Sequence, residues 1–269
     1  MTDPVPYEVY AIRYATVERR AAENFIGADD VHETAARMDY FVWVARNDYR
    51  TVVIDTGFDE QAAQRRRRQF LRAPVEGLRL MGIDARKVQD VIVTHLHYDH
   101  AGNLAHFPSA RFHLQDREMA YATGRYMGMP FFSHAYEADD VIAAVRAVYG
   151  GRMVFHDGDG TVAPGLTVHH IGGHTRGLQA VRVWTRVGWV VLASDAAHYA
   201  ANMNEKRPFP VVANVMEMAD GWRKLRELAS AEEYIVPGHD PLVMSWYRAP
   251  EPELEGIVVR LDAARKTTG

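Results

Sequence analysis

The chain has 269 residues, of which 48% are hydrophobic and 25% are charged, and its formal net charge is −4. This composition is typical of an ordinary globular protein, and the length favours one domain over residues 1–269. The lack of a basic excess argues against nucleic acid and anionic membranes as partners, and the lack of cysteine excludes disulfides and thiolate metal ligands.

Strands and helices are mixed along the whole chain. Runs rich in β-branched and aromatic residues predict strands at residues 40–46, 50–57, 89–95, 110–114, 166–174, 181–186, 188–195 and 233–239. Helix-like stretches cover residues 59–81 with a break near Pro74, 137–149, 213–230 and 251–265. Short connections between neighbouring strands indicate antiparallel pairing, and the helices need a sheet face to cover, so the pattern predicts a layered α/β sandwich.

The N-terminal part of the chain carries two further expectations. Its start lacks the basic and apolar segments of a secretory signal, and no apolar run reaches 18 residues, so a cytoplasmic protein is expected. The arginine run at residues 65–68 lies within an expected helix for which Asp59 is a candidate N-cap. We interpret this run as a solvated helix face.

The segment VTHLHYDHAG, residues 93–102, concentrates metal-ligand side chains after an apolar strand. In an extended chain His95 and His97 project to the same side, about 7 Å apart, a spacing that suits one metal ion. Asp99 and His100 follow where a turn or helix begins, so they are free to reach a second ion. The alternative, polar loop residues without a ligand, is disfavoured because three of the 13 histidines fall within six positions.

Further candidate ligands end later strands. His174, Asp195 and His239 each stand on a turn of glycine or other small residues after an expected strand. Such residues are needed, because four groups from one loop cannot close two coordination shells. The neighbouring Gly173 and Gly238 allow the backbone to approach a metal without a Cβ clash.

These residues in this order resemble the metallo-β-lactamase superfamily. The resemblance rests on HxHxDH at residues 95–100, on Asp55 in VVIDTG before it, and on His174, Asp195 and His239 after it. It spans residues 40–240 and implies a four-layer αββα sandwich with the metals at the edge of two facing sheets.

The resemblance also implies roles for these side chains. Seven of them would share two metal ions: His95, His97 and His174 hold the first, Asp99, His100 and His239 hold the second, and Asp195 bridges both together with a hydroxide. Asp55 is implied as a carboxylate that orients the ligand loops, with a simple turn aspartate as the alternative.

Nitrogen and oxygen ligands without thiolates suit two Zn²⁺ ions per chain, with Fe, Mn or Co as other candidates. Zn²⁺ lowers the pKa of bound water from about 15.7 toward 7, so hydrolysis is the expected reaction. Within the superfamily the chain is most similar to the quorum-quenching N-acyl homoserine lactone lactonases, on the strings DYFVWVAR, THLHYDHAGN and LASDAAHYAANM. That similarity implies a zinc-dependent lactonase in which the bridging hydroxide opens an N-acyl homoserine lactone or a related small lactone or ester.

The chain departs from the lactonase pattern beside Asp195. Those lactonases place a tyrosine three residues after the bridging aspartate, whereas this chain has His198 there and Tyr199 next. Either side chain is suited to hydrogen-bond the carbonyl oxygen, and His198 also to protonate the leaving alkoxide; the alternative is that both only pack at the rim. The predicted catalytic residues are therefore Asp99, His198 and Tyr199.

Other functions and partners stay open at this point. A phosphodiesterase or phosphotriesterase on the same site is the second candidate; it needs cationic anchors, and Arg176 is the only arginine close to a ligand in the sequence. A metal-binding sensor without turnover is a third reading, disfavoured by the complete ligand set. Residues 119–136 are rich in Met and aromatic side chains. This segment would either line an apolar substrate pocket, belong to the core, or form the interface of a homodimer.

Overall fold

The strands form two sheets in this computed structural model, which describes residues 4–27 and 35–266. The first sheet has the order β13-β1-β2-β3-β5-β6-β7, with β4 paired to β1, and the second has the order β12-β11-β10-β9-β8. The strands of the first are β1 (Glu8–Arg20), β2 (Ala35–Asn47), β3 (Arg50–Ile54), β4 (Gln69–Phe70), β5 (Asp90–Ile92), β6 (Arg111–Gln115), β7 (Met153–His156) and β13 (Val258–Arg260). Those of the second are β8 (Gly160–Ala163), β9 (Leu166–His170), β10 (Gln179–Thr185), β11 (Gly188–Ser194) and β12 (Ile235–Pro237).

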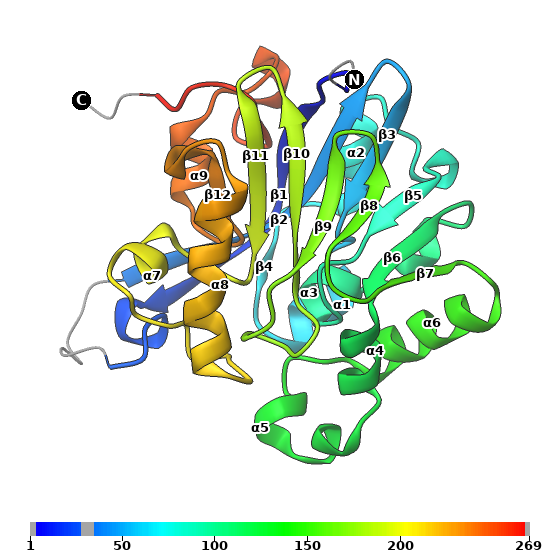
Figure 1. The fold of residues 1–269 in the computed structure, drawn as a ribbon, viewed down its shortest axis with the longest axis vertical. Coiled ribbons are helices and arrows are strands. Elements are labelled where there is room, and N and C mark those ends of the chain that lie inside the picture. The colour runs from blue at the N-terminus through cyan, green and yellow to red at the C-terminus, as the bar shows by residue number, and fades with distance from the viewer. Residues whose placement is uncertain (1–3, 28–34, 267–269) are drawn as a thin grey trace.

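Helices cover the outer faces of both sheets. They are α1 (Glu60–Arg65), α2 (Pro74–Leu80), α3 (Tyr98–Ala101), α4 (Asp116–Ala122), α5 (Pro130–Ser133), α6 (Ala138–Tyr149), α7 (Ala200–Asn204), α8 (Val215–Leu228) and α9 (Leu242–Trp246). Figure 1 shows α8 and α6 on opposite sides of the molecule. None of the described helices has both the length and the apolar character that a membrane crossing requires.

Three clusters of buried apolar side chains fill the spaces between the layers. Alternate residues of β2 belong to different clusters, because successive side chains of a strand point to opposite faces of the sheet. Phe41 and Trp43 pack between the two sheets, whereas Val42 and Val44 pack under the helices of the first sheet. A third cluster lies between β11 and α8 and includes Trp222. The αββα sandwich expected from the sequence is confirmed.

Two expected elements differ from the structure. The helix expected at residues 251–265 is wrong: this segment holds a 3₁₀ turn at Pro252–Leu254 and then β13. Pairing with β1, in which Tyr10 lies opposite Arg260, overrides the helical pattern because it satisfies the backbone of both strands. The expected strands also lacked β1 itself, which lies inside the first sheet between β13 and β2.

The helix expected at residues 59–81 is interrupted before Pro74. Helix α1 ends at Arg65, Arg67 adopts a left-handed φ of 54°, and β4 then pairs with β1. The arginine run 65–68 is therefore mostly not a helix face. Its expected role as a purely solvated surface is wrong as well, because Arg66 and Arg68 line the cavity described below.

The strand directions bring the candidate ligands to one edge. Strands β3 and β5 are parallel, so Asp55 after β3 and His95 after β5 emerge at the same end of the first sheet. In the second sheet β9 and β11 both pair antiparallel with β10, and β12 is parallel to β11. The residues after these three strands therefore also share one edge.

Candidate metal centre

All seven predicted ligand side chains meet in one buried cluster. Within the described residues, His95, His97 and His174 form one group and Asp99, His100 and His239 form another, with one nitrogen or oxygen atom per residue within 4.8 Å of the others. A further group contains His95, His100 and Asp195. The first two groups have the same members as the two ligand sets that the resemblance implied, while the role of each residue as a ligand stays a prediction.

Asp195 lies between the two groups. Its Oδ2 is 3.2 Å from His174 Nε2, in the first group. Its Oδ1 is 3.1 Å from His239 Nε2 and 3.3 Å from His100 Nε2, in the second group. A carboxylate with one oxygen toward each group has the geometry of a bridging ligand.

Acceptors outside the cluster orient the imidazole rings. In each of three rings the Nδ1–H donates outward, which leaves Nε2 for the cluster and fixes the tautomer. The pairs are His100 with Asp55 Oδ2 at 2.7 Å, His174 with the Val211 carbonyl at 2.7 Å, and His239 with the Asp39 carbonyl at 2.9 Å.

Asp55 also anchors the loop that carries the histidine motif. Its carboxylate accepts from the Thr94 backbone N–H at 2.7 Å and from the Thr94 hydroxyl at 2.8 Å. The residue is fully buried and has a left-handed φ of 61°, a conformation that costs backbone energy. The contact with His100 is the one expected for a carboxylate that orients a ligand.

Several atoms of the cluster have no hydrogen-bond partner among the described residues. They are His95 Nε2, His100 Nε2 and Asp195 Oδ1, all of them buried. A buried polar atom without a partner is costly, and cations held by the two groups would satisfy all three atoms. Imidazole nitrogens with carboxylate oxygens are a donor set that suits zinc and neighbouring transition metals, so the residues fit a dinuclear metal site.

The charge states of the first group and of Asp195 favour cation binding, whereas those of two histidines in the second group do not. Desolvation by burial lowers the pKa of His174 to about 3, and it also lowers the pKa of the other two histidines of that group well below the ordinary value. Burial alone would raise the pKa of Asp195, but the surrounding histidines, His198 first, hold it well below its usual range. Neutral imidazole and ionised carboxylate are the forms that bind metals. Burial alone would lower the pKa of His100 and His239, but the charge of Asp195 raises it in both, so a metal would have to displace protons from these two rings.

Glu118 joins two of the ligand loops, and sequence reasoning did not identify it. This fully buried carboxylate accepts from the Leu96 N–H at 2.9 Å, between the two histidines of the motif. It also accepts from the Thr175 hydroxyl at 2.6 Å and the Gly177 N–H at 3.1 Å, just after His174. No motif marks it, because α4 contributes it from outside every ligand loop.

The glycines next to the ligands stand where a Cβ would clash with neighbouring protein atoms, while their expected role toward a metal stays a prediction. A Cβ on Gly238 would lie 2.7 Å from the Ser194 carbonyl oxygen and 2.8 Å from Asp195 Oδ1. Gly173 has a φ of 81° and packs against the backbone of Met218. Larger residues at either position would displace a ligand loop.

The family model described as the metallo-beta-lactamase superfamily matches residues 37–246. The chain belongs to this superfamily. Among curated relatives, an N-acyl homoserine lactonase AttM of Azorhizobium caulinodans is 31% identical over 175 residues, which cover 62% of this chain and 64% of that protein. The AttM of Agrobacterium fabrum is 28% identical over 183 residues, covering 66% and 68%. The chain thus spans about two thirds of the length of these relatives.

Solved structures agree on the superfamily fold. A quorum-quenching N-acyl homoserine lactone hydrolase matches with a TM-score of 0.77 at 20% identity, covering 93% of this chain and 99% of that one. A hydrolase of the same superfamily, AbOPH, matches with a TM-score of 0.67 at 16% identity, covering 89% and 92%. At these identities the likeness establishes the fold alone.

The two residues at which this superfamily member departs from the lactonase pattern have different positions. His198 is buried, lines the cavity above the cluster and has its Nε2 3.0 Å from Asp195 Oδ2, while its ring stacks on Phe209 at 3.6 Å between centroids. The Tyr199 hydroxyl instead donates to the Arg37 carbonyl at 3.2 Å. The structure brings His198 to the cluster and does not bring Tyr199 there.

The cavity above the cluster has a volume of about 210 Å³. Only His134 and Ala135 of the expected pocket segment 119–136 line it. Elsewhere in that segment Met119, Met127 and Phe132 pack against the apolar cluster under the first sheet. Besides ligand residues and His198, the lining consists of Arg19, Met38, Tyr40, Arg66, Arg68, Tyr98, His134, Ala135, Phe209 and Val211.

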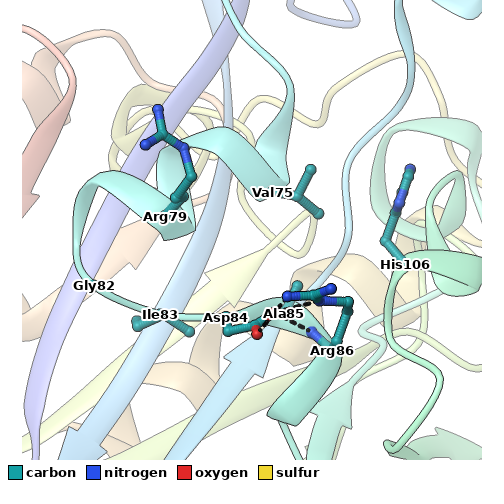
Figure 2. Close-up of a pocket in the computed structure, with 8 residues that line it drawn as sticks. All are labelled: Val75, Arg79, Gly82, Ile83, Asp84, Ala85, Arg86 and His106. Carbon is teal, nitrogen blue, oxygen red and sulfur yellow. Dashed lines mark hydrogen bonds and ion pairs between the residues drawn. The ribbon is translucent and has the colours of Figure 1, made fainter.

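A larger cavity lies elsewhere. It has a volume of about 520 Å³ and is lined by Val75 and Arg79 of α2, by residues 82–86 after that helix, and by His106 from a later 3₁₀ turn (Figure 2). Its charged residues Asp84 and Arg86 pair with each other at 2.9 Å. None of the cluster residues lines it, so its size does not make it the reaction site.

Proposed function

We propose that this chain is a dinuclear metal-dependent lactonase that opens the ring of a small lactone, with N-acyl homoserine lactones and related compounds as the starting class. The observation that carries the proposal is the buried cluster in which two three-residue groups flank Asp195. The lactonase names of the curated relatives support the choice of substrate. Zinc is the proposed metal, because the donors are imidazoles and carboxylates.

Each part of the site has a task in ester hydrolysis. Two bound divalent cations supply Lewis acidity at the carbonyl and an activated water at neutral pH. His95, His97 and His174 would hold one of them, and Asp99, His100 and His239 would hold the other. The acceptors that orient His100, His174 and His239 keep the site rigid. The cavity restricts the substrate to a small ring or a short acyl group next to the cluster.

We assign to His198 a hydrogen bond with the substrate's carbonyl or leaving oxygen. Its Nδ1 is buried without a partner among the described residues, and the ring borders the cavity. His198→Gln is therefore expected to lower kcat by roughly 10- to 1,000-fold, the range for loss of one such group. The measurement is steady-state lactone hydrolysis beside the metal content. A full rate would leave His198 as a packing residue, and a loss of metal would make it a ligand instead.

The proposal is tested by turnover of a substrate panel with the metal-loaded protein. The panel contains an acyl homoserine lactone, a simple γ-lactone, a 4-nitrophenyl ester and a phosphodiester. We expect kcat/KM for the lactones to exceed that for the phosphodiester by orders of magnitude. Preferred hydrolysis of the phosphodiester would replace the lactonase assignment.

Phosphoester hydrolysis remains the second candidate because of one specific observation. Sequence reasoning found no arginine near the ligands except Arg176, which does not line the cavity above the cluster. The structure has three other arginines in that lining, Arg19, Arg66 and Arg68. Cationic anchors of this kind suit an anionic substrate, and the panel separates the two reactions.

A further inference from the structure

Three arginines from outside the ligand loops line the cavity above the cluster. Arg19 lies on β1, and Arg66 and Arg68 lie between α1 and β4. Strand β4 pairs with β1 through Phe70 and Ala15, and this pairing carries the arginine segment to the side of the cavity. The three charges are thus a product of the fold, since they are not neighbours of the ligands in sequence.

Arg66 has its charge balanced by the protein. Its guanidinium forms an ion pair with Glu137 at 2.8 Å and donates to the His134 carbonyl at 2.9 Å. It also lies over the ring of Tyr98, 3.9 Å from the centroid. Arg66 therefore acts as a fixed wall of the cavity.

Arg68 is held in place by neutral groups only. Its Nε donates to the Tyr98 hydroxyl at 3.2 Å and its Nη1 to the Arg66 carbonyl at 2.8 Å. Within residues 4–27 and 35–266, no carboxylate lies within 4.0 Å of this guanidinium and no protein group accepts from its Nη2. The half-buried side chain is thus oriented, yet it retains a donor edge for a ligand.

The charge balance of the site favours an anion at this position. Among the seven candidate ligands only Asp99 and Asp195 are carboxylates, and both lie against histidines of the cluster rather than against Arg68. Besides the Tyr40 and Tyr98 hydroxyls, the carboxylate that acts on Arg68 is Asp99, and it belongs to the second ligand group. A further unpaired cation beside such a centre is repelled unless the ligand brings negative charge.

We propose that the substrate carries an anionic oxygen group, in the first place a carboxylate, and that Arg68 binds this group while the ester carbonyl lies over the cluster. The inference rests on the proposed function and narrows it to acidic lactones or esters. An arginine presents planar, paired donors that match a carboxylate or phosphate better than any neutral acyl chain.

The test compares substrates of the same shape that differ only in charge. N-succinyl homoserine lactone has a terminal carboxylate, and N-succinamoyl homoserine lactone has an amide in its place. We expect the metal-loaded protein to favour the acid by roughly 10- to 100-fold in kcat/KM, the effect of a charge-assisted hydrogen bond. Arg68→Gln should abolish this preference, and Arg68→Lys should retain part of it because the charge stays.

Arg65→Gln is the matched control, because Arg65 is exposed, belongs to the same run and does not line the cavity. It should keep the full preference for the acid. Equal rates on acid and amide in the unmodified protein, or the same acid preference in Arg68→Gln, would overturn the inference.

Two further arms separate this inference from the proposed function. If the lactones are not hydrolysed, the lactonase proposal fails. The acid and amide forms of a 4-nitrophenyl succinate ester then still measure whether Arg68 favours an anionic substrate. Bis(4-nitrophenyl) phosphate tests the other anion. If its kcat/KM exceeds that of the acid lactone and falls in Arg68→Gln, Arg68 binds a phosphate group and the carboxylate proposal is overturned. Turnover of none of these compounds overturns both proposals.

Discussion

His97→Ala and His239→Ala are each expected to lose metal and to lower lactone turnover by more than about 100-fold, since loss of even an outer partner of a ligand costs 10- to 100-fold. His97 belongs to the first group and His239 to the second, so each variant should empty a different site. The measurement is elemental analysis of the purified protein together with kcat/KM.

His156→Ala is the matched control for these variants. His156 lies at the end of β7 and pairs with His113 at 3.1 Å, in no contact with the cluster groups of the described chain. It should keep two metals and full turnover. A His97→Ala or His239→Ala protein with both metals and normal rates would remove that residue from the ligand set.

The candidate ligands were predictable because local sequence carries them. His95, His97, Asp99 and His100 form one contiguous motif, and its place after an apolar strand follows from β-branched residues alone. The later ligands were also recognisable, since each ends a strand at a small-residue turn. Whether the ligands meet depends on the order of the strands in the two sheets. Only the family resemblance indicated in advance that these strand ends lie together.

The remaining features of the site depend on pairing between distant segments. Glu118 and Arg68 reach the site because α4 packs near the loop after β9 and because β4 pairs with β1. Neither pairing leaves a local signal, and the run at 65–68 has the composition of an exposed helix. That residues 1–269 form one domain stays a prediction.

Helix propensity also failed where the sheet competed for the same backbone. Residues 251–265 have a helical pattern, yet Val258–Arg260 completes the open edge beside β1. An unpaired edge strand leaves a row of backbone donors and acceptors without partners, and a short added strand removes that cost. This choice is decided by β1, which the sequence pattern did not identify as a strand.

Asp195→Asn is expected to preserve the fold and to uncouple the two metals. The amide has nearly the same shape, but it lacks the negative charge that would hold two cations close together. The oxygens of Asp195 face histidine nitrogens of both groups at 3.1–3.3 Å, which places this charge between the two sites. We expect metal content to fall from about two ions to about one and kcat to fall by roughly 100-fold or more.

The control for this variant is Asp90→Asn, the same change in another buried carboxylate. Asp90 begins β5, at the end of the strand away from the histidine motif, and pairs with Arg111 at 2.8 Å. Its loss should lower thermal stability through that ion pair while metal content and kcat stay unchanged. Because both variants remove one buried negative charge, a fall in metal content confined to Asp195→Asn isolates the bridging position as the cause. Unaltered turnover with two metals in Asp195→Asn would mean that the hydrolytic centre does not need this carboxylate as its bridge.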